Sequence, residues 1–212
     1  MLTVSQITCE RGHRPLFAPA SFSLAPGQAL HLQGDNGVGK TSLLRIVCGL
    51  SPAVSGEVRW QGRLVRDVAT EFRAALFYLG HALSLKENLN ALENLMADAA
   101  VRGHDLSAAE AQAALRRIGL RGREALPVRV MSQGQKRRVA LARLMVSTAN
   151  LWVLDEPFVA LDPQAVDQLR HVLGQQVAAG GMLLLTSHQP VSLLDAQGHE
   201  VAVAQHRLEA SA

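Results

Sequence analysis

Residues 34–42 of the sequence, GDNGVGKTS, combine the residue types that bind a nucleotide phosphate. Gly34, Gly39, Lys40 and Thr41 fit the pattern G-x-x-x-x-G-K-[ST]. Glycines let backbone N–H groups close around phosphate oxygens, lysine supplies a positive charge for the β- and γ-phosphates, and threonine offers a hydroxyl to Mg²⁺. The segment therefore predicts a site for a nucleoside triphosphate with Mg²⁺.

A second glycine-containing segment, residues 131–143, reads MSQGQKRRVALAR. Ser132 is a plausible helix N-cap, Gly134 permits close backbone approach, and Gln135 adds a donor. A helix N-terminus favours anions, and basic side chains follow here. On these residues alone, a well-capped helix with a basic exposed face is favoured over a second phosphate site.

Two adjacent carboxylates, Asp155 and Glu156, end the apolar run LWVLDEP. Asp155 is the candidate to meet a Mg²⁺ ion held by Thr41. Glu156 would then face the γ-phosphate and could polarise an attacking water. Paired acids at a strand end are often ordinary surface charge, but their occurrence after a phosphate loop favours the catalytic interpretation.

The chain alternates short apolar segments with helical periodicity, which predicts an α/β fold with a mostly parallel core sheet. A helix with Leu43, Leu44, Val47 and Leu50 on one stripe is expected to follow the phosphate loop. Alternation around Gly62 predicts antiparallel strands. The expected strands occupy residues 29–34, 55–65, 74–81, 150–157 and 180–188.

Residues 85–130 differ from the rest because they contain two stretches of helical periodicity, with Gly103 and Gly119 as breaks. Ser107 followed by Glu110 is a capping-box pattern that starts one of these helices. We expect one domain, residues 1–212, in which 1–84 and 131–212 form the core with a β subdomain and 85–130 a helical subdomain.

Composition limits the classes of partner. The formal net charge of +3 is too small to argue for nucleic acid. No apolar run approaches the roughly 20 residues of a membrane helix, so membrane contact is expected only through partners. Cys9 and Cys48 have neither disulfide-framework nor zinc-site spacing, which favours a reduced, cytoplasmic setting.

Five motifs in order resemble those of the ATP-binding cassette (ABC) ATPases, a P-loop NTPase family, over nearly the whole chain. They are GDNGVGKTS, MSQGQ, LWVLDEP, ALD at 160–162 and TSH at 186–188. In that family the MSQGQ-type signature turn binds the ATP held by the phosphate loop of a second copy. The resemblance thus implies ATP hydrolysis by a head-to-tail dimer, and explains why one chain has two phosphate-binding segments.

Residue roles follow from the resemblance by position. Ser132, Gly134 and Gln135 would contact the γ-phosphate of the ATP bound to the other copy. Glu156 would be the general base, Asp155 and Thr41 would hold Mg²⁺, and His188 would sense the γ-phosphate. Asp162 would couple the two sites across the dimer. The implied phosphate loop comprises Gly34, Asp35, Asn36, Gly37, Val38, Gly39, Lys40, Thr41 and Ser42.

Three positions depart from the family pattern. Gln133 occupies a usual glycine position, which we expect to be tolerated because Ser132 and Gly134 remain. His81 occurs where a glutamine usually touches Mg²⁺, and it either takes that role or merely fills space. Arg11 occurs where an aromatic ring often stacks on adenine, and its guanidinium plane could stack instead.

Three local stretches narrow the resemblance to the ATP-binding subunits of bacterial cytochrome c biogenesis haem exporters: CERGHRPLF, LFYLGH and LARLMVSTANLWVLDEPFVALD. That family implies a peripheral subunit on the cytoplasmic face of the inner membrane, paired with integral subunits that handle haem. ATP hydrolysis there would drive release of a haem-loaded carrier. The alternatives are another small ABC exporter or importer, a soluble ABC ATPase acting on ribosomes or DNA, and a nucleotide-dependent scaffold.

Overall fold

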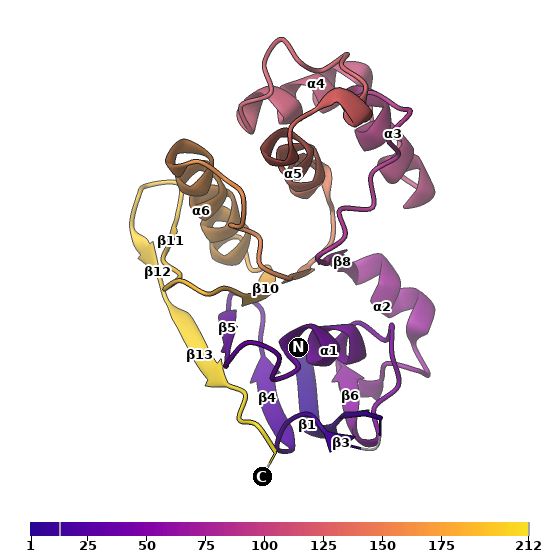
Figure 1. Cartoon of the computed structure of the whole chain (residues 1–212), viewed down its shortest axis with the longest axis vertical. Coiled ribbons are helices and arrows are strands. Elements are labelled where there is room, and N and C mark those ends of the chain that lie inside the picture. The colour runs from indigo at the N-terminus through magenta and orange to yellow at the C-terminus, as the bar shows by residue number, and fades with distance from the viewer. Residues whose placement is uncertain (13, 212) are drawn as a thin grey trace. The chain divides into compact units, whose positions relative to one another are not determined.

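The computed structural model describes residues 1–12 and 14–211, and the chain divides into two compact units (Figure 1). Unit 1 comprises Met1–Gly80, Ala149–Pro157 and Leu173–Ala212, and unit 2 comprises His81–Thr148 and Phe158–Val172. His13, within the stretch CERGHRPLF, and Ala212, the last residue of the expected domain, lie outside the described residues. The expected single domain with a helical subdomain at 85–130 stays a prediction.

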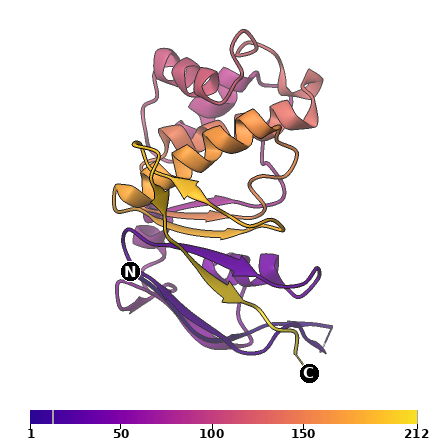
Figure 2. The same cartoon turned by 90° about the vertical axis from the view of Figure 1, so that its left-hand side faces the viewer.

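Unit 1 contains a five-stranded sheet in which all neighbouring strands are parallel, which confirms the predicted core sheet. Strand β13 (Val203–Arg207), the C-terminal strand drawn in yellow in Figure 2, pairs with β5 (Ala29–Gln33), although the two are far apart in the sequence. In spatial order the strands are β13 (Val203–Arg207), β5 (Ala29–Gln33), β10 (Met182–Thr186), β9 (Leu151–Leu154) and β8 (Leu76–Leu79).

A second, antiparallel sheet of unit 1 confirms the strands expected around Gly62. Its order is β4 (Ala20–Leu24), β1 (Leu2–Thr8), β6 (Ser55–Trp60) and β7 (Arg63–Leu64). Two short antiparallel pairs complete the strands, β2 (Glu10–Arg11) with β3 (Arg14–Pro15) and β11 (Leu193–Leu194) with β12 (Glu200–Val201).

The core of unit 1 forms where helix α1 (Lys40–Val47) packs with residues of both sheets and of α2 (Ala69–Ala75). Leu43, Leu44 and Val47 of α1 are fully buried, as their spacing predicts. Leu50 is 51% exposed because the helix ends at Val47, so the predicted apolar stripe is one residue too long.

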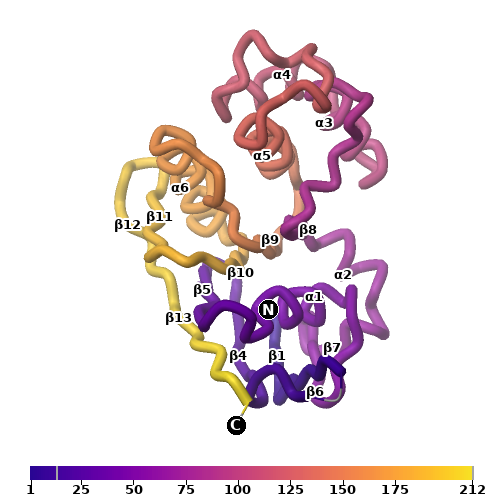
Figure 3. Tube along the Cα trace, in the orientation of Figure 1, coloured from indigo at the N-terminus to yellow at the C-terminus, as the bar shows by residue number. Residues whose placement is uncertain are grey.

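Unit 2 is helical, and Figure 3 shows α3 (Ala91–Val101), α4 (Ala108–Arg117) and α5 (Gln133–Ala142) grouped together. The Ser107 capping box is confirmed, with the hydroxyl accepting from Glu110 N–H and the Glu110 carboxylate accepting from Ser107 N–H. The elements are α3 (Ala91–Val101), α4 (Ala108–Arg117), the 3-10 helices η1 (Val128–Val130) and η2 (Arg143–Val146), α5 (Gln133–Ala142) and the first part of α6 (Pro163–Ala178).

Buried Asn94 of α3 holds the segment that follows His81. Its Oδ1 accepts from Lys86 N–H at 2.8 Å, and its Nδ2 donates to the carbonyls of Lys86, Leu89 and Asn90 at 3.0, 3.3 and 2.9 Å. The three carbonyls also accept backbone N–H groups, from Leu89, Val128 and Asn94, so the Asn94 amide adds a second bond to each. Its Oδ1 provides the hydrogen bond of the Lys86 N–H, which ties the turn to α3.

We predict that Asn94→Ala lowers the free energy of unfolding by about 2 kcal/mol, because the Lys86 N–H loses its acceptor and the side-chain bonds of buried Asn94 to three carbonyls are lost. Met96→Ala is the control, since Met96 lies on the same helix and is 36% exposed. The measurement is the urea midpoint of each variant. Equal midpoints for the two variants would show that the 86–90 turn does not depend on Asn94.

Candidate functional site

The predicted phosphate loop is the turn between the end of β5 and the start of α1, and its backbone requires glycine. Gly34, Gly37 and Gly39 have φ angles of 147°, 79° and 106°, which side chains rarely adopt. A Cβ at Gly34 would lie 2.8 Å from the carbonyl oxygen of Leu208, and one at Gly39 would lie 2.8 Å from the Phe17 ring. Contacts and backbone angles together require glycine at Gly34 and Gly39, whereas at Gly37 the backbone angle alone favours it.

The first turn of α1 presents its backbone N–H groups at this loop. The N-cap residue is Gly39, which has no side chain to bond them. The Lys40 ammonium donates to the carbonyls of Gly34 at 2.7 Å and Asp35 at 3.1 Å, so its positive charge lies over the loop. Exposed N–H groups, the positive end of the helix dipole and an ammonium group together suit a phosphate.

A hydrogen-bonded network joins the loop to the ends of two neighbouring strands. Thr41 Oγ1 donates to Asp155 Oδ2 at 2.7 Å, and Thr186 Oγ1 donates to Asp155 Oδ1 at 2.7 Å. Thr186 Oγ1 also accepts from Glu156 N–H at 2.9 Å. Asp155 is only 4% exposed and Thr186 is fully buried. Both carboxylate oxygens of Asp155 are therefore held in fixed positions beside the loop.

Sequence reasoning does not single out Thr186, although it is the first residue of the TSH motif and ends an apolar strand. The negative charge of Asp155 also reaches Tyr78 on the neighbouring strand β8. Burial and, next in size, this charge raise the pKa of Tyr78 to about 12. Tyr78 therefore stays neutral at ordinary pH.

Glu156 and His188 face each other at the same edge. His188 Nε2 lies 3.4 Å from Glu156 Oε1. Glu156 has a φ of 51°, an uncommon conformation for a residue with a side chain and one that occurs often at functional sites. The histidine and the carboxylate are thus close enough for either to orient the other.

These groups surround one cavity of about 280 Å³ in unit 1. The structure brings together here most of the residues expected at the nucleotide. The cavity is lined by Arg11, Leu16, Asn36, Gly37, Gly39, Lys40, Thr41, Ser42, Asp155, Glu156 and His188. Two other loop residues point elsewhere, since Val38 is buried in the core and the exposed Asp35 side chain lies 3.5 Å from Arg207 Nη2.

The second predicted phosphate segment belongs to unit 2 and begins α5. Ser132 is the N-cap, as expected, and forms a reciprocal capping box with Gln135. A Cβ on Gly134 would lie 3.1 Å from the carbonyl oxygen of Ala160, so this glycine also permits close packing against the ALD turn. A cavity of about 410 Å³ is lined here by Gly119, Arg123, Ser132, Gly134, Gln135, Arg138, Ala160 and Asp162.

His81 and Arg11 are the two expected site residues that depart in type from the family pattern. His81 is the first residue of unit 2 and is exposed, and its role at Mg²⁺ stays a prediction. Arg11 lines the cavity of the phosphate loop from strand β2, where a planar guanidinium can meet a base. Among the described residues, no cluster of three or more His, Cys, Asp or Glu side chains is arranged to hold a metal ion.

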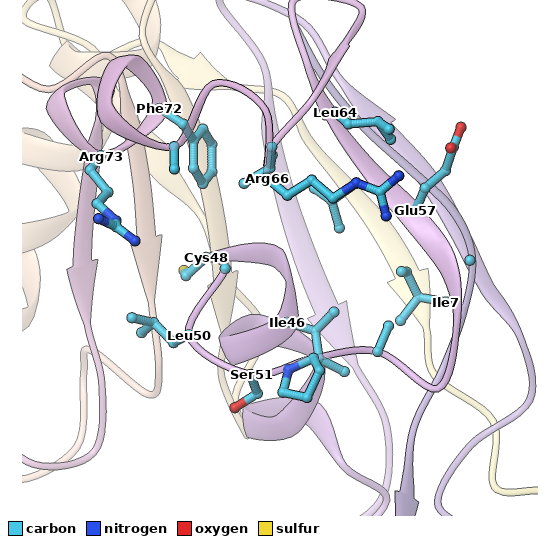
Figure 4. Close-up of a pocket in the computed structure, with 17 residues that line it drawn as sticks. Ile7, Ile46, Cys48, Leu50, Ser51, Glu57, Leu64, Arg66, Phe72 and Arg73 are labelled. Atoms are coloured by element: carbon cyan, nitrogen blue, oxygen red, sulfur yellow. The ribbon is translucent and has the colours of Figure 1, made fainter.

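A larger cavity of about 610 Å³ in unit 1 was not predicted from the sequence (Figure 4). Ile46, Leu50 and Phe72 give it apolar walls, and Arg66 and Arg73 line it together with Glu57, whose carboxylate pairs with Arg59 at 2.6 Å. The buried Cys48 lines it too, and burial raises the pKa of this thiol, which keeps it protonated. An apolar side chain with an acidic neighbour fits such a cavity chemically.

The sequence of this chain matches a protein-family model and several curated proteins. The model of the ABC transporter family matches residues 17–159. The cytochrome c biogenesis ATP-binding export protein CcmA of Dechloromonas aromatica is 50% identical over 91% of this chain and 95% of its own. The proteins of that name from Nitrosomonas europaea and Escherichia coli O157:H7 are 45% and 42% identical over 96% and 98% of both chains.

Solved structures agree with the fold. An ATP-binding subunit of an ABC transporter, 26% identical, superimposes with a TM-score of 0.79 over 92% of this chain and 85% of that one. An ATP-binding cassette whose dimeric post-hydrolysis structure holds ADP and Pi is 20% identical. It superimposes with a TM-score of 0.80 over 99% of this chain and 98% of its own. In the described part of the chain, no helix is long and apolar enough to cross a membrane. The chain belongs to the ABC transporter family, as an ABC-type ATPase whose curated relatives are cytochrome c biogenesis ATP-binding export proteins.

Proposed function

We propose that this ATPase couples ATP binding and hydrolysis in a head-to-tail dimer to haem export, or to release of a haem-loaded carrier, during cytochrome c maturation. The observation that carries the proposal is identity of 42–50% with export proteins of cytochrome c biogenesis over most of the chain. Another small exporter or importer, or a soluble ABC ATPase, is the alternative, and no feature of the site favours it.

The residues around the phosphate loop support the first step, which is ATP binding. The uncapped N–H groups of α1 and the Lys40 ammonium would bind the β- and γ-phosphates, and Ser42 would lie near the α-phosphate. Lys40 would exchange its bonds to the carbonyls of Gly34 and Asp35 for phosphate oxygens. Arg11 would stack on the base, which predicts only moderate selectivity for adenine.

The chemistry of Thr41 and Asp155 fits Mg²⁺. One hydroxyl and one carboxylate oxygen lie 2.7 Å apart, and Mg²⁺ typically binds one or two such protein oxygens together with phosphate oxygens and water. When bound, the ion would neutralise charge that develops on the phosphates. Asp155 would keep its orientation through Thr186, which bonds its other oxygen.

Glu156 would take a proton from the attacking water while the water oxygen forms a bond to the γ-phosphorus. The bond to the leaving ADP oxygen would break at the same time, giving ADP and phosphate. His188, 3.4 Å from the Glu156 carboxylate, would orient that carboxylate and contact the γ-phosphate. The Thr186 hydroxyl holds the Glu156 backbone N–H and so supports the uncommon backbone conformation that aims this side chain.

The cavity at Ser132 supports a role for a second copy. Its lining residues Ser132, Gly134 and Gln135 lie at a helix N-terminus, where an anion is stabilised. In our proposal they bind the γ-phosphate of the ATP held by the other copy. Each of the two ATP molecules would then lie between the phosphate loop of one chain and the signature turn of the other.

A membrane subunit is the other proposed partner. The cavity of Figure 4 offers apolar walls and two arginines, which suits an apolar segment of a partner that carries a carboxylate. Leu50 and Val54 beside it are 51% and 59% exposed. The family resemblance implies that residues 85–130 also face this partner. The subunit would be peripheral, on the cytoplasmic face of the inner membrane.

Glu156→Gln should still bind ATP but lose at least about 100-fold in kcat, because an amide cannot accept the proton from water. ATP-dependent dimers should accumulate in this variant. Glu71→Gln is the matched control, since Glu71 is exposed and pairs with the exposed Arg63 at 3.1 Å. Phosphate release and size-exclusion chromatography with ATP measure the two effects. Comparable kcat values in the two variants would exclude Glu156 as the base.

Thr186→Val removes one buried hydroxyl and nearly preserves the shape. We predict a rise of about tenfold in the Mg²⁺ concentration for half-maximal ATPase activity, because Asp155 loses the bond that orients it. Removing the hydrogen-bond partner of a metal ligand typically lowers metal affinity about 10- to 100-fold. Thr70→Val, on exposed α2 surface, is the control. If the Mg²⁺ dependence of both variants matched wild type, Thr186 would have no role in orienting Asp155.

The cytochrome c assignment is tested by purifying the subunit from its own cells in mild detergent. We expect integral membrane subunits to co-purify, with a Soret band in the absorption spectrum. A membrane partner without haem would remove the haem assignment but retain the transport ATPase. Co-purification with ribosomes or DNA, without a membrane partner, would overturn both the haem assignment and the role in transport.

A further inference from the structure

Arg138 of α5 links the helix of the signature turn to two other segments of unit 2. Its Nη2 donates to Asp162 Oδ2 in an ion pair, and its Nη1 donates to the Gly119 carbonyl at 3.2 Å. Its side chain is 19% exposed and lines the same cavity as Ser132 and Gln135. The two ends of one guanidinium group are thus fixed by partners from different loops.

The other oxygen of Asp162 is also occupied. Oδ1 accepts from Ala165 N–H at 2.9 Å, and the Asp162 carbonyl accepts from Val166 N–H at 3.0 Å. Asp162 therefore caps the start of α6 while Arg138 holds its second oxygen. The expected role of Asp162 across a dimer requires this carboxylate to have a defined orientation, and Arg138 provides a partner that can define it.

Gly119, Gly134 and Ala160 allow the segments around Arg138 to pack closely. Gly119 has a φ of +79°, and a Cβ there would lie 2.6 Å from Arg138 Nη1. The ALD turn approaches α5 closely at Gly134, and Ala160 in that turn has a φ of +61°, which is uncommon for alanine. Two glycines and one strained residue thus allow the turn, the loop at Gly119 and α5 to meet.

We propose that Arg138 is a positioning residue, which ties the Asp162 turn to the signature helix so that both respond together to a phosphate bound at Ser132. The inference rests on the proposed function, because it assumes that the second copy presents its ATP here. Arg138 would not need to touch the nucleotide. It would set the orientation of Asp162 toward the other copy and so affect the hydrolysis step rather than ATP binding by the phosphate loop.

A purely structural ion pair is the competing explanation, and the two differ in what they predict. Partly exposed ion pairs contribute little to stability, so Arg138→Gln should change the unfolding temperature no more than loss of another such pair. Arg116→Gln is the matched control, since it breaks the Arg116–Glu124 pair (3.1 Å) of unit 2 and does not line the cavity.

The test measures kcat and KM for ATP hydrolysis, and the unfolding temperature, in the whole chain with its co-purified membrane partners. Arg138→Gln should lower kcat about tenfold with KM within about twofold of wild type, as expected when an interaction acts only in the transition state. Asp162→Asn should give a similar loss. The double variant should be no slower than either single one, because both break one coupled unit.

Arg138→Lys keeps the charge but not the two-ended geometry, so it should recover part of the activity. The proposal would be overturned by a kcat for Arg138→Gln equal to that of Arg116→Gln, or by single losses that multiply in the double variant. It would also be overturned if kcat followed the unfolding temperature across the Gln and Lys variants. Failure of the proposed function is seen separately, as wild-type protein that does not hydrolyse ATP.

Discussion

The site depends on one constraint, which is that the carboxyl ends of parallel strands meet at one edge of the sheet. Strands β5, β9 and β10 are neighbours in the order β5–β10–β9, and each ends at a residue or loop of the site. The phosphate loop follows β5, Asp155 follows β9, and Thr186 ends β10. Three hydrogen bonds therefore form one network that includes Thr41 and Thr186, which lie more than 140 positions apart in the sequence.

The same edge accounts for the uncommon backbone conformation of Glu156. A buried carboxylate is costly unless its oxygens are bonded, and Asp155 has a threonine hydroxyl on each oxygen. The next residue, Glu156, then has to turn its side chain toward the cavity, which its left-handed backbone permits. Thr186 serves both residues at once, since it bonds the side chain of one and the backbone of the other.

The sequence predicts much of this site because its residues lie in local motifs. Strand, glycine loop and helix occur in order at residues 29–47, and the acidic pair directly follows an apolar run, so both could be located without coordinates. The parallel sheet follows from the alternation of elements. Thr186, Arg138 and the cavity at Leu50 could not be predicted in this way, because each gains its role from partners distant in sequence.

Leu50 and Asp162 show two different ways in which a local pattern is incomplete. Leu50 has the spacing of a core residue, but the helix ends before it, so a position that periodicity assigns to the interior is exposed beside a cavity. Asp162 has the pattern of an N-cap followed by Pro163, and it does cap α6. Its second oxygen bonds Arg138, so one carboxylate satisfies a local helix rule and a distant contact together. A carboxylate held by two such partners has one orientation, which is what a residue facing a second copy requires.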